Sequence, residues 1–437
     1  MCLERIAARR VADGDDVYLE KKCPRHGAFR TILWRGPPSY DAWGDGEAAP
    51  RPRAPSAAGT GCPFECGLCP EHLRPTCCVL LEVTSRCNLC CPTCFADSAG
   101  QGSDPGLDDI EAWFRSLVAR GAGAANIQLS GGEPTLRDDL PEVMALGRSL
   151  GFGFLQLNTN GLRLARDDEY VRRLKEAGLS CVFLQFDGVS EEAHLRLRGA
   201  PLLARKVAAI DRCAEHGLGV VLVPTLVPGV NTEEIGAVID FAARRGPAVR
   251  GVHFQPVSYF GRYPRVPSDA DRITLPEVMR AIERQTGRAI LATDLSPPSA
   301  ENAFCSFSGS FVRNTGGTLR RRAGDRDRSP GCCSSPSPDD EVRRAREYVA
   351  RRWAYPEPIG ARSCSCGSDG LDRIISEAHN TSFCISGMAF QDAWNIDLAR
   401  LRECYLHVAS PDGRLVPFCA YNATSAAGTS LHRRRVP

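Results

Sequence analysis

The segment from about residue 79 to about residue 290 alternates between short apolar runs and helical patterns. The apolar runs read VLLEV, NIQLS, FLQLN, CVFLQF, VVLVPTL and VHFQP. Between them, DDIEAWFRSLVARG and PLLARKVAAIDRCAEHG carry apolar residues at helical spacing. Regular strand–helix alternation is typical of a parallel sheet, so we expect an α/β fold with six units in a barrel or partial barrel. The predicted buried helix faces are Ile110, Trp113, Phe114, Leu117 and Val118 in the first segment, and Leu203, Val207, Ile210 and Ala214 in the second.

Polar or glycine-rich residues follow every one of these apolar runs. In parallel barrels the active site is built on the loops at the carboxyl ends of the strands. A purely structural barrel would not need such residues at every end of one face, so we expect a catalytic site there. The segments after the six runs are a cysteine-rich loop, Gly131–Pro134, Asn158–Gly161, Asp187–Gly188, Val227–Asn231 and Gln255–Pro256.

The cysteine-rich loop, CNLCCPTCF, permits two ligand frames. Two Cys-x2-Cys pairs would make a closed zinc site, whereas Cys87-x3-Cys91-x2-Cys94 would leave Cys90 as a bystander. The chemistry at the strand ends favours the second frame, in which three thiolates hold three irons of a four-iron cluster. The fourth iron then keeps an open position, as in a catalytic metal site.

A small molecule with an amine and a carboxylate can chelate that open iron. Gly131 and Gly132 would let backbone approach such a ligand, because no Cβ stands in the way. Glu133 could accept a hydrogen bond from its ammonium group.

The loop CNLCCPTCF, with LSGGEP one strand later, resembles the radical SAM superfamily. In that family a [4Fe-4S] cluster reduces S-adenosyl-L-methionine to a 5′-deoxyadenosyl radical, which abstracts hydrogen from an unreactive C–H bond. The resemblance implies that this protein is such an enzyme, with a radical SAM barrel. It implies cluster ligation by Cys87, Cys91 and Cys94. It also implies three sets of cofactor contacts. The methionine end would contact Gly131, Gly132, Glu133 and Pro134. The ribose would face Asn158, Asn160, Gln185 and Asp187, and the adenine would lie near Leu226 and Val227.

Three further stretches, CPRHGAF, CPFECGLCPEH and PDGRLVPFCAYN, resemble one subfamily. It contains archaeal tetraether lipid synthase and the bacterial radical SAM (seleno)protein TrsS, and the overall likeness is nearer to TrsS. The resemblance suggests a lipid-like substrate for carbon–carbon coupling or methylation. It also implies a reductant such as flavodoxin or ferredoxin.

The chain has 21 cysteines, which in a reducing compartment indicate metal ligation or redox chemistry. Cys62-x3-Cys66-x2-Cys69 repeats the spacing of the first loop, and we interpret it as an auxiliary [4Fe-4S] site that Cys419 could complete. Structural zinc is the alternative.

Cys23 and His26 look like half of a metal knuckle, with Cys2 as a candidate for the other half. A complete site would suit a mononuclear iron or a zinc ion. A knuckle normally needs two cysteines two residues apart, which suggests a clipped start, and an empty site is the alternative.

The remaining cysteines are harder to assign from the sequence. Cys181 and Cys213 are interpreted as small core residues. The pair Cys332–Cys333 has either a redox role or none. Thiols sufficient for a further cluster come from Cys364, Cys366, Cys384, Cys404 and Cys419.

Composition and patterning limit the other function classes. A net charge of +2 does not indicate nucleic-acid binding. No apolar run reaches spanning length, and the N-terminus has no signal core, so we expect a cytoplasmic protein. The alternative function is a zinc-rich, non-catalytic adaptor that binds a partner.

The expected segments are a Cys-rich metal-binding region with a linker at 1–72, the core barrel at 73–290 and a Cys-rich auxiliary-cluster region at 291–437.

Overall fold

The structure is a computed structural model. It describes residues 2–44, 60–67, 71–98, 102–298, 300–314, 316–322, 337–356 and 380–433. The described strands form one small antiparallel sheet and one sheet of twelve strands.

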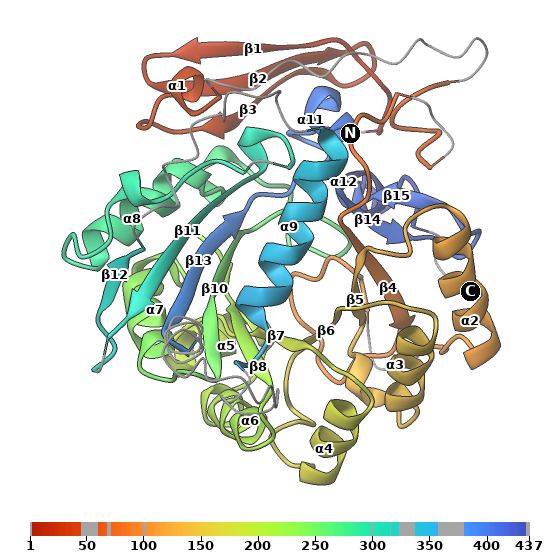
Figure 1. Ribbon diagram of the computed structural model, residues 1–437. Helices are drawn as coiled ribbons and strands as arrows, with labels where there is room; N and C mark the ends of the chain where they lie inside the picture. The colour runs from red at the N-terminus through yellow and green to blue at the C-terminus, as the bar shows by residue number, and fades with distance from the viewer. Residues whose placement is uncertain are drawn as a thin grey trace.

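Six neighbouring parallel strands form the centre of the large sheet, and helices cover its outer face (Figure 1). This arrangement confirms the predicted partial (β/α)6 barrel. The strands are β4 (Cys78–Thr84), β5 (Asn126–Gly131), β6 (Leu155–Thr159), β7 (Cys181–Gln185), β8 (Gly219–Val223) and β10 (Val249–Pro256). The helices are α2 (Leu107–Ala119), α3 (Leu140–Ser149), α4 (Asp168–Glu176), α5 (Glu191–Arg198), α6 (Leu203–Glu215), α7 (Ile235–Ala243) and α8 (Leu275–Gln285). The short β9 (Thr225–Leu226) pairs with β10.

The core lies between these strands and helices. Strand β8 is buried at all five positions, because a parallel strand is covered on both faces. Cys181 and Cys213 are 0% and 1% exposed, which confirms that they are core residues.

Two of the predicted helix faces need correction. Val118 of α2 is 46% exposed, whereas Ile110 belongs to the buried face as predicted. In α6 the fully buried face includes Lys206 and Cys213, and the predicted Leu203 is only half-buried. The buried face is therefore rotated from the predicted one, and within it Lys206 donates a hydrogen bond from Nζ to a buried backbone carbonyl, an interaction that an apolar pattern cannot reveal.

Residues after 290 extend the barrel sheet at both edges, although their sequence pattern fades there. β13 pairs in parallel with β10, and β14 pairs in parallel with β4. Helix α9 runs across the strands (Figure 1). The elements of this region are β11 (Ser306–Arg313), β12 (Leu319–Arg321), α9 (Pro338–Trp353), β13 (Ser382–Met388), α11 (Leu398–Arg402), β14 (Leu406–Ala409), β15 (Leu415–Pro417) and α12 (Phe418–Asn422).

The small sheet packs on these C-terminal segments. Lys21 donates from Nζ to the carbonyl oxygen of Ala393 at 2.9 Å, and Arg10 pairs with Asp397. The sheet consists of β1 (Ala8–Asp13), β2 (Asp16–Cys23) and β3 (Gly27–Trp34), and α1 (Tyr40–Gly44) follows it.

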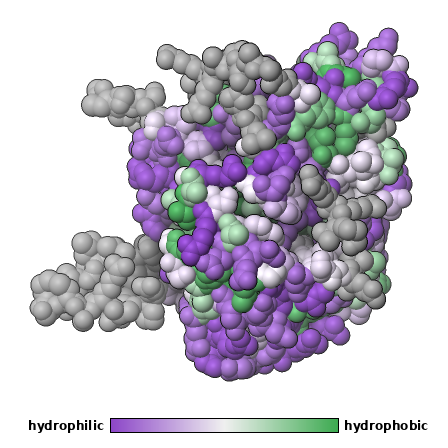
Figure 2. Space-filling view, turned by 90° about the vertical axis from the view of Figure 1, so that its right-hand side faces the viewer, coloured by the Kyte–Doolittle hydropathy of each residue, from purple (hydrophilic) through white to green (hydrophobic). Residues whose placement is uncertain are grey.

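The face in Figure 2 is mainly hydrophilic, and its hydrophobic residues form small patches. Among the described residues, no helix is both long enough and apolar enough to cross a membrane.

Candidate active site and metal centres

A cavity of about 300 Å³ opens inside the barrel. Residues at the carboxyl ends of the strands line one part of it, as predicted from the polar run ends. Its walls include Cys87, Cys91 and Cys94 together with Gly131, Gly132 and Glu133.

The four cysteines of the loop after β4 lie in different environments. Cys87, Cys91 and Cys94 line the cavity, whereas Cys90 is exposed and lies outside its wall. Burial, with the nearby Glu133 carboxyl and the other two thiols, raises the pKa of Cys87 to about 11. Cys91 and Cys94 therefore lie close enough to Cys87 to affect its ionisation. This arrangement fits the three-thiolate frame with Cys90 as a bystander.

The space beside Gly131 and Gly132 is filled by the protein's own backbone, and their predicted approach to a bound ligand stays a prediction. A Cβ on Gly131 would lie 2.1 Å from the carbonyl oxygen of Thr84, and one on Gly132 would lie 2.1 Å from that of Arg86. The backbone N–H of Gly132 donates to Thr84, and that of Glu133 donates to Arg86. The space that a side chain would fill thus belongs to the protein's own backbone, immediately before the cysteine loop. These glycines position that loop.

A second contact holds the other end of the loop. Cys94 and Arg262 exchange backbone hydrogen bonds of 2.9 and 3.0 Å. The Arg262 side chain donates from Nε to the carbonyl oxygen of Cys91 at 3.0 Å. A Cβ on Gly261 would lie 2.6 Å from the Cys94 carbonyl oxygen. Sequence reasoning missed both residues, because no motif links this segment to the loop.

The Glu133 carboxylate is buried among donors from the protein. Its Oε1 accepts from the backbone N–H and hydroxyl of Thr135 and from the hydroxyl of Thr159, and its Oε2 accepts from the N–H of Asn160. Glu133 therefore ties β5 to the loop after β6. A contact from Oε2 to a ligand ammonium stays a prediction.

The other residues predicted to hold the cofactor divide into two groups. Asn158, Asn160, Gln185 and Val227 line the cavity. The side chains of Pro134, Asp187 and Leu226 are buried behind its wall, with exposed fractions of 1% for both Asp187 and Leu226.

Asp187 acts on the site through Arg198, which sequence reasoning missed. Its two oxygens accept from Nε and Nη2 of Arg198 at 2.7 and 2.6 Å. Arg198 lines the cavity, and the Asp187 carboxylate and the Cys91 thiol both raise the pKa of its guanidinium. The structure therefore places the Arg198 guanidinium beside Cys91, a predicted cluster ligand. The Asp187 carboxylate, which was predicted to face the cofactor, lies behind Arg198 and does not line the cavity.

Lys206 is a second cation near the site. Its Nζ donates to the carbonyl oxygen of Asn160 at 2.6 Å, and burial lowers its pKa to about 8. Helix α6 also contains Arg205, Asp211 and Arg212, so its sequence gives no signal that marks Lys206 as the buried cation.

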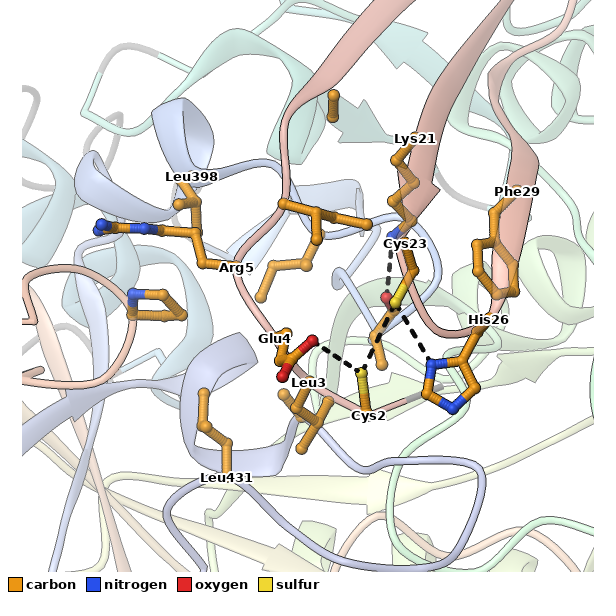
Figure 3. A pocket seen from close by; sticks show the side chains of 16 residues that line it. Cys2, Leu3, Glu4, Arg5, Lys21, Cys23, His26, Phe29, Leu398 and Leu431 are labelled. Atoms are coloured by element: carbon orange, nitrogen blue, oxygen red, sulfur yellow. Dashed lines mark hydrogen bonds between the residues drawn. The ribbon is translucent and has the colours of Figure 1, made fainter.

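The N-terminal residues form a separate group of metal-type ligands (Figure 3). The sulfurs of Cys2 and Cys23 are 3.9 Å apart, and Cys23 Sγ is 3.3 Å from His26 Nδ1. These three ligand atoms all lie within 4.8 Å of one another, which suits a single ion. The half-knuckle and Cys2 therefore meet as predicted.

Cys62 and Cys66 are buried, and a hydrogen bond between their thiols lowers the pKa of Cys62. Both belong to one buried cluster with Cys419, the predicted completing ligand. Cys69 lies outside the described residues, as do Cys332, Cys333, Cys364 and Cys366.

Cys419 also has cysteine neighbours from the C-terminal region. Burial holds the pKa of the Cys404 thiol well above its usual range, and the neighbouring Cys419 and Cys305 raise it further. Arg400 donates from Nη2 to Cys305 Sγ at 3.5 Å, and the backbone N–H of Gln391 donates to Cys419 Sγ at 3.2 Å. Sequence spacing had not grouped Cys305 with this set.

Two family models match the chain. One, described as the radical SAM superfamily, matches residues 81–242. The other, described as the HMPTM N-terminal zinc ribbon domain, matches residues 1–35.

The 7,8-dihydro-6-hydroxymethylpterin dimethyltransferase of Methanocaldococcus jannaschii is 33% identical over 484 residues, covering 100% of this chain and 93% of that protein. The GTP 3′,8-cyclase of Nautilia profundicola is 31% identical over 179 residues, covering 40% of this chain and 55% of that protein. The crystal structure of Streptococcus suis SuiB bound to precursor peptide SuiA has a TM-score of 0.42 and 18% identity, covering 49% of this chain and 46% of that one.

The chain belongs to the radical SAM superfamily. It is therefore an iron–sulfur enzyme that uses S-adenosyl-L-methionine, and a non-catalytic zinc adaptor is set aside. Its family implies a [4Fe-4S] cluster, and three thiols on one cavity wall fit that group. When bound, the cluster supplies the electron that converts S-adenosylmethionine into a 5′-deoxyadenosyl radical.

Proposed function

We propose that this protein is a radical SAM methyltransferase whose substrate is a reduced pterin or a similar compact heterocycle. The observation that carries the proposal is its 33% identity to a pterin dimethyltransferase over the whole chain. A lipid-like substrate, suggested by the subfamily resemblance, is the competing possibility.

The amide groups inside the barrel support a heterocyclic substrate. Gln156 donates from Nε2 to Asn158 Oδ1 at 2.8 Å, and Asn158 donates from Nδ2 to Gln128 Oε1 at 3.2 Å. All three side chains line the cavity. An amide presents both donors and an acceptor, so the groups that these mutual bonds leave over can match the alternating polar edge of a pterin, whereas an alkyl chain could not pair with them.

In this proposal, residues at the ends of several strands bind the cluster and S-adenosylmethionine. Cys87, Cys91 and Cys94 hold the cluster, and the Gly131–Pro134 segment with Asn158, Asn160, Gln185 and Val227 surrounds S-adenosylmethionine. Arg198 adds a positive charge near Cys91, which would affect the cluster's reduction potential.

The remaining metal sites are also part of the proposal. Cys62, Cys66 and Cys69 hold an auxiliary [4Fe-4S] cluster with Cys419 or a neighbouring thiol. Cys2, Cys23 and His26 hold zinc or a mononuclear iron. Flavodoxin or ferredoxin supplies electrons, since cofactor cleavage consumes one.

Hydrogen abstraction provides a direct test. The anaerobically reconstituted protein is incubated with S-adenosylmethionine, a reductant and ring-deuterated 7,8-dihydro-6-hydroxymethylpterin, the substrate class named for the relative. We expect the pterin to accelerate formation of 5′-deoxyadenosine and deuterium to enter that product. The pterin should gain methyl groups by mass spectrometry when a methyl donor is present. Active enzyme that transfers no deuterium from the pterin but does so from a long-chain alkyl substrate would favour the lipid assignment.

A further inference from the structure

Helix α9 closes the end of the barrel opposite the cysteine loop. Trp353, its last residue, packs in a buried cluster with Cys181 and Phe183 of β7 and Val221 of β8. Cys181 is the first residue of β7, so the helix lies at the amino ends of the strands. Val349 and Trp353 line the same cavity as the three loop cysteines. One cavity therefore extends from the predicted cluster site to α9.

The C-terminal turn of α9 is held firmly in this position. A Cβ on Gly219, the first residue of β8, would lie 2.2 Å from the carbonyl oxygen of Trp353. Arg250 donates from Nε to the carbonyl oxygen of Arg352 at 3.0 Å. Val342, nearer the other end of the helix, is fully buried. These contacts make α9 a fixed wall of the cavity.

Three aromatic side chains face one another at this end of the cavity, and we call them the aromatic floor: Phe183, His253 and Trp353. Ring centroids are 4.8 Å apart for Phe183 and Trp353, and 5.4 Å apart for Phe183 and His253. Burial lowers the pKa of His253 to about 4, so its imidazole is uncharged at neutral pH. All three side chains line the cavity. The Phe183 ring is tilted by 39° to each of the other two rings, so the floor offers separate ring faces that are uncharged and largely apolar.

We infer that the aromatic floor is the substrate subsite and that Trp353 determines which ligand shape it accepts. A planar heterocycle stacks on the floor, since aromatic rings favour offset or edge contacts with other π systems. The amides of Gln128 and Gln156 then contact its polar edge, and Asn158, which faces S-adenosylmethionine in the proposed function, is hydrogen-bonded to both. This inference rests on the proposed function. It assigns the selection of a compact ring to helix α9, which lies outside residues 81–242, the segment that the radical SAM family model matches.

The same wall disfavours a long chain. The cavity of about 300 Å³ lies at the lower end of the usual range for ligand pockets, and the cofactor must share it. An extended alkyl chain that ran from the cysteine loop toward the floor would meet Val349 and Trp353 of α9. Replacing Trp353 by a small residue would lengthen the cavity and remove the stacking surface together.

The test measures binding of 7,8-dihydro-6-hydroxymethylpterin to full-length, cluster-loaded protein by equilibrium dialysis in the presence of S-adenosylmethionine. We expect Trp353→Ala to raise the Kd about tenfold or more, on the scale of lost stacking on one aromatic ring. Trp353→Phe, which keeps a ring, should raise it no more than about threefold. Trp113→Ala removes the same side chain from a half-buried position on α2, outside the cavity, and should leave the Kd unchanged.

Iron content, sulfide content and S-adenosylmethionine binding show whether each variant retains its folded site. If Trp353→Ala loses them, Val349→Phe takes its place. That variant adds bulk to the cavity beside the floor and should also weaken pterin binding about tenfold or more. An unchanged or lower Kd in the folded floor variants overturns the inference and leaves the proposed function intact. Failure of the wild-type protein to bind the pterin overturns both.

Discussion

The cysteine loop of the barrel and the cysteines of the C-terminal region hold thiols in contrasting surroundings. Cys87 and Cys94 are only partly buried and face a cavity. Cys419 lies deep in an apolar cluster, where its Sγ already accepts a hydrogen bond from backbone. The first setting leaves room for a ligand on the metal, and the second is enclosed by protein. In the proposed function, this contrast assigns chemistry to the first site and electron transfer or stabilisation of the fold to the second.

The largest expected effect tests the open site. Cys91→Ala should reduce reductive cleavage of S-adenosylmethionine at least about a hundredfold, because the loss of one thiolate leaves the cluster poorly held. Cys90→Ala is the matched control, since Cys90 is the exposed neighbour, and it should keep most activity. Formation of 5′-deoxyadenosine is the measurement. An inactive Cys90→Ala beside an active Cys91→Ala would restore the frame with two zinc-type pairs.

The enclosed site should respond differently. Cys419→Ala is expected to lower iron and sulfide content by about one cluster while cofactor cleavage at the first cluster survives in part. Cys213→Ala, which removes a buried thiol from the barrel core, should leave the iron content unchanged. Iron and sulfide assays on both variants provide the comparison. A full iron content in Cys419→Ala would remove this residue from the ligand set.

A third change tests how tightly the barrel holds its cysteine loop. Gly132→Ala places a methyl group 2.1 Å from the Arg86 carbonyl oxygen, so the loop must move. We expect the free energy of unfolding to fall by about 1–3 kcal/mol and the cluster content to fall with it. The control is Gly153→Ala, because a Cβ there has nothing within 4 Å. Urea unfolding and iron analysis measure both effects, and a fully loaded Gly132→Ala protein would argue against close packing of this loop.

The barrel could be predicted from the sequence because its signals are local. Six apolar runs and the spacing of Cys87, Cys91 and Cys94 each lie within a few neighbouring residues. The contact of Arg262 with the loop could not be predicted, since it joins residues that are 171 positions apart. The same holds for the edge strands: β14 pairs with β4 across most of the chain. Burial of Lys206 depends on a carbonyl from another loop, which periodicity cannot show.

The last comparison concerns two buried carboxyl groups, one in each region. In the barrel, Arg198 lowers the pKa of Asp187 although burial opposes it. In the C-terminal region, burial raises the pKa of Glu301 from 4.5 to about 7, and its Oε1 accepts from the Ser306 hydroxyl. The two groups therefore give stability contributions of opposite sign with pH.

Of these two carboxyl groups, only Glu301 titrates in the native protein between pH 5 and 8. Its folded pKa lies above its unfolded pKa, so the native state binds more protons in that interval and stability falls as pH rises through about 7. The loss reaches at most about 3 kcal/mol at pH 8. Glu301→Gln cannot ionise and should flatten the decline, while Glu191→Gln, an exposed position on α5, should leave it unchanged. Urea unfolding at several pH values measures the slope, and the same decline in Glu301→Gln as in the wild type would show that Glu301 does not cause it.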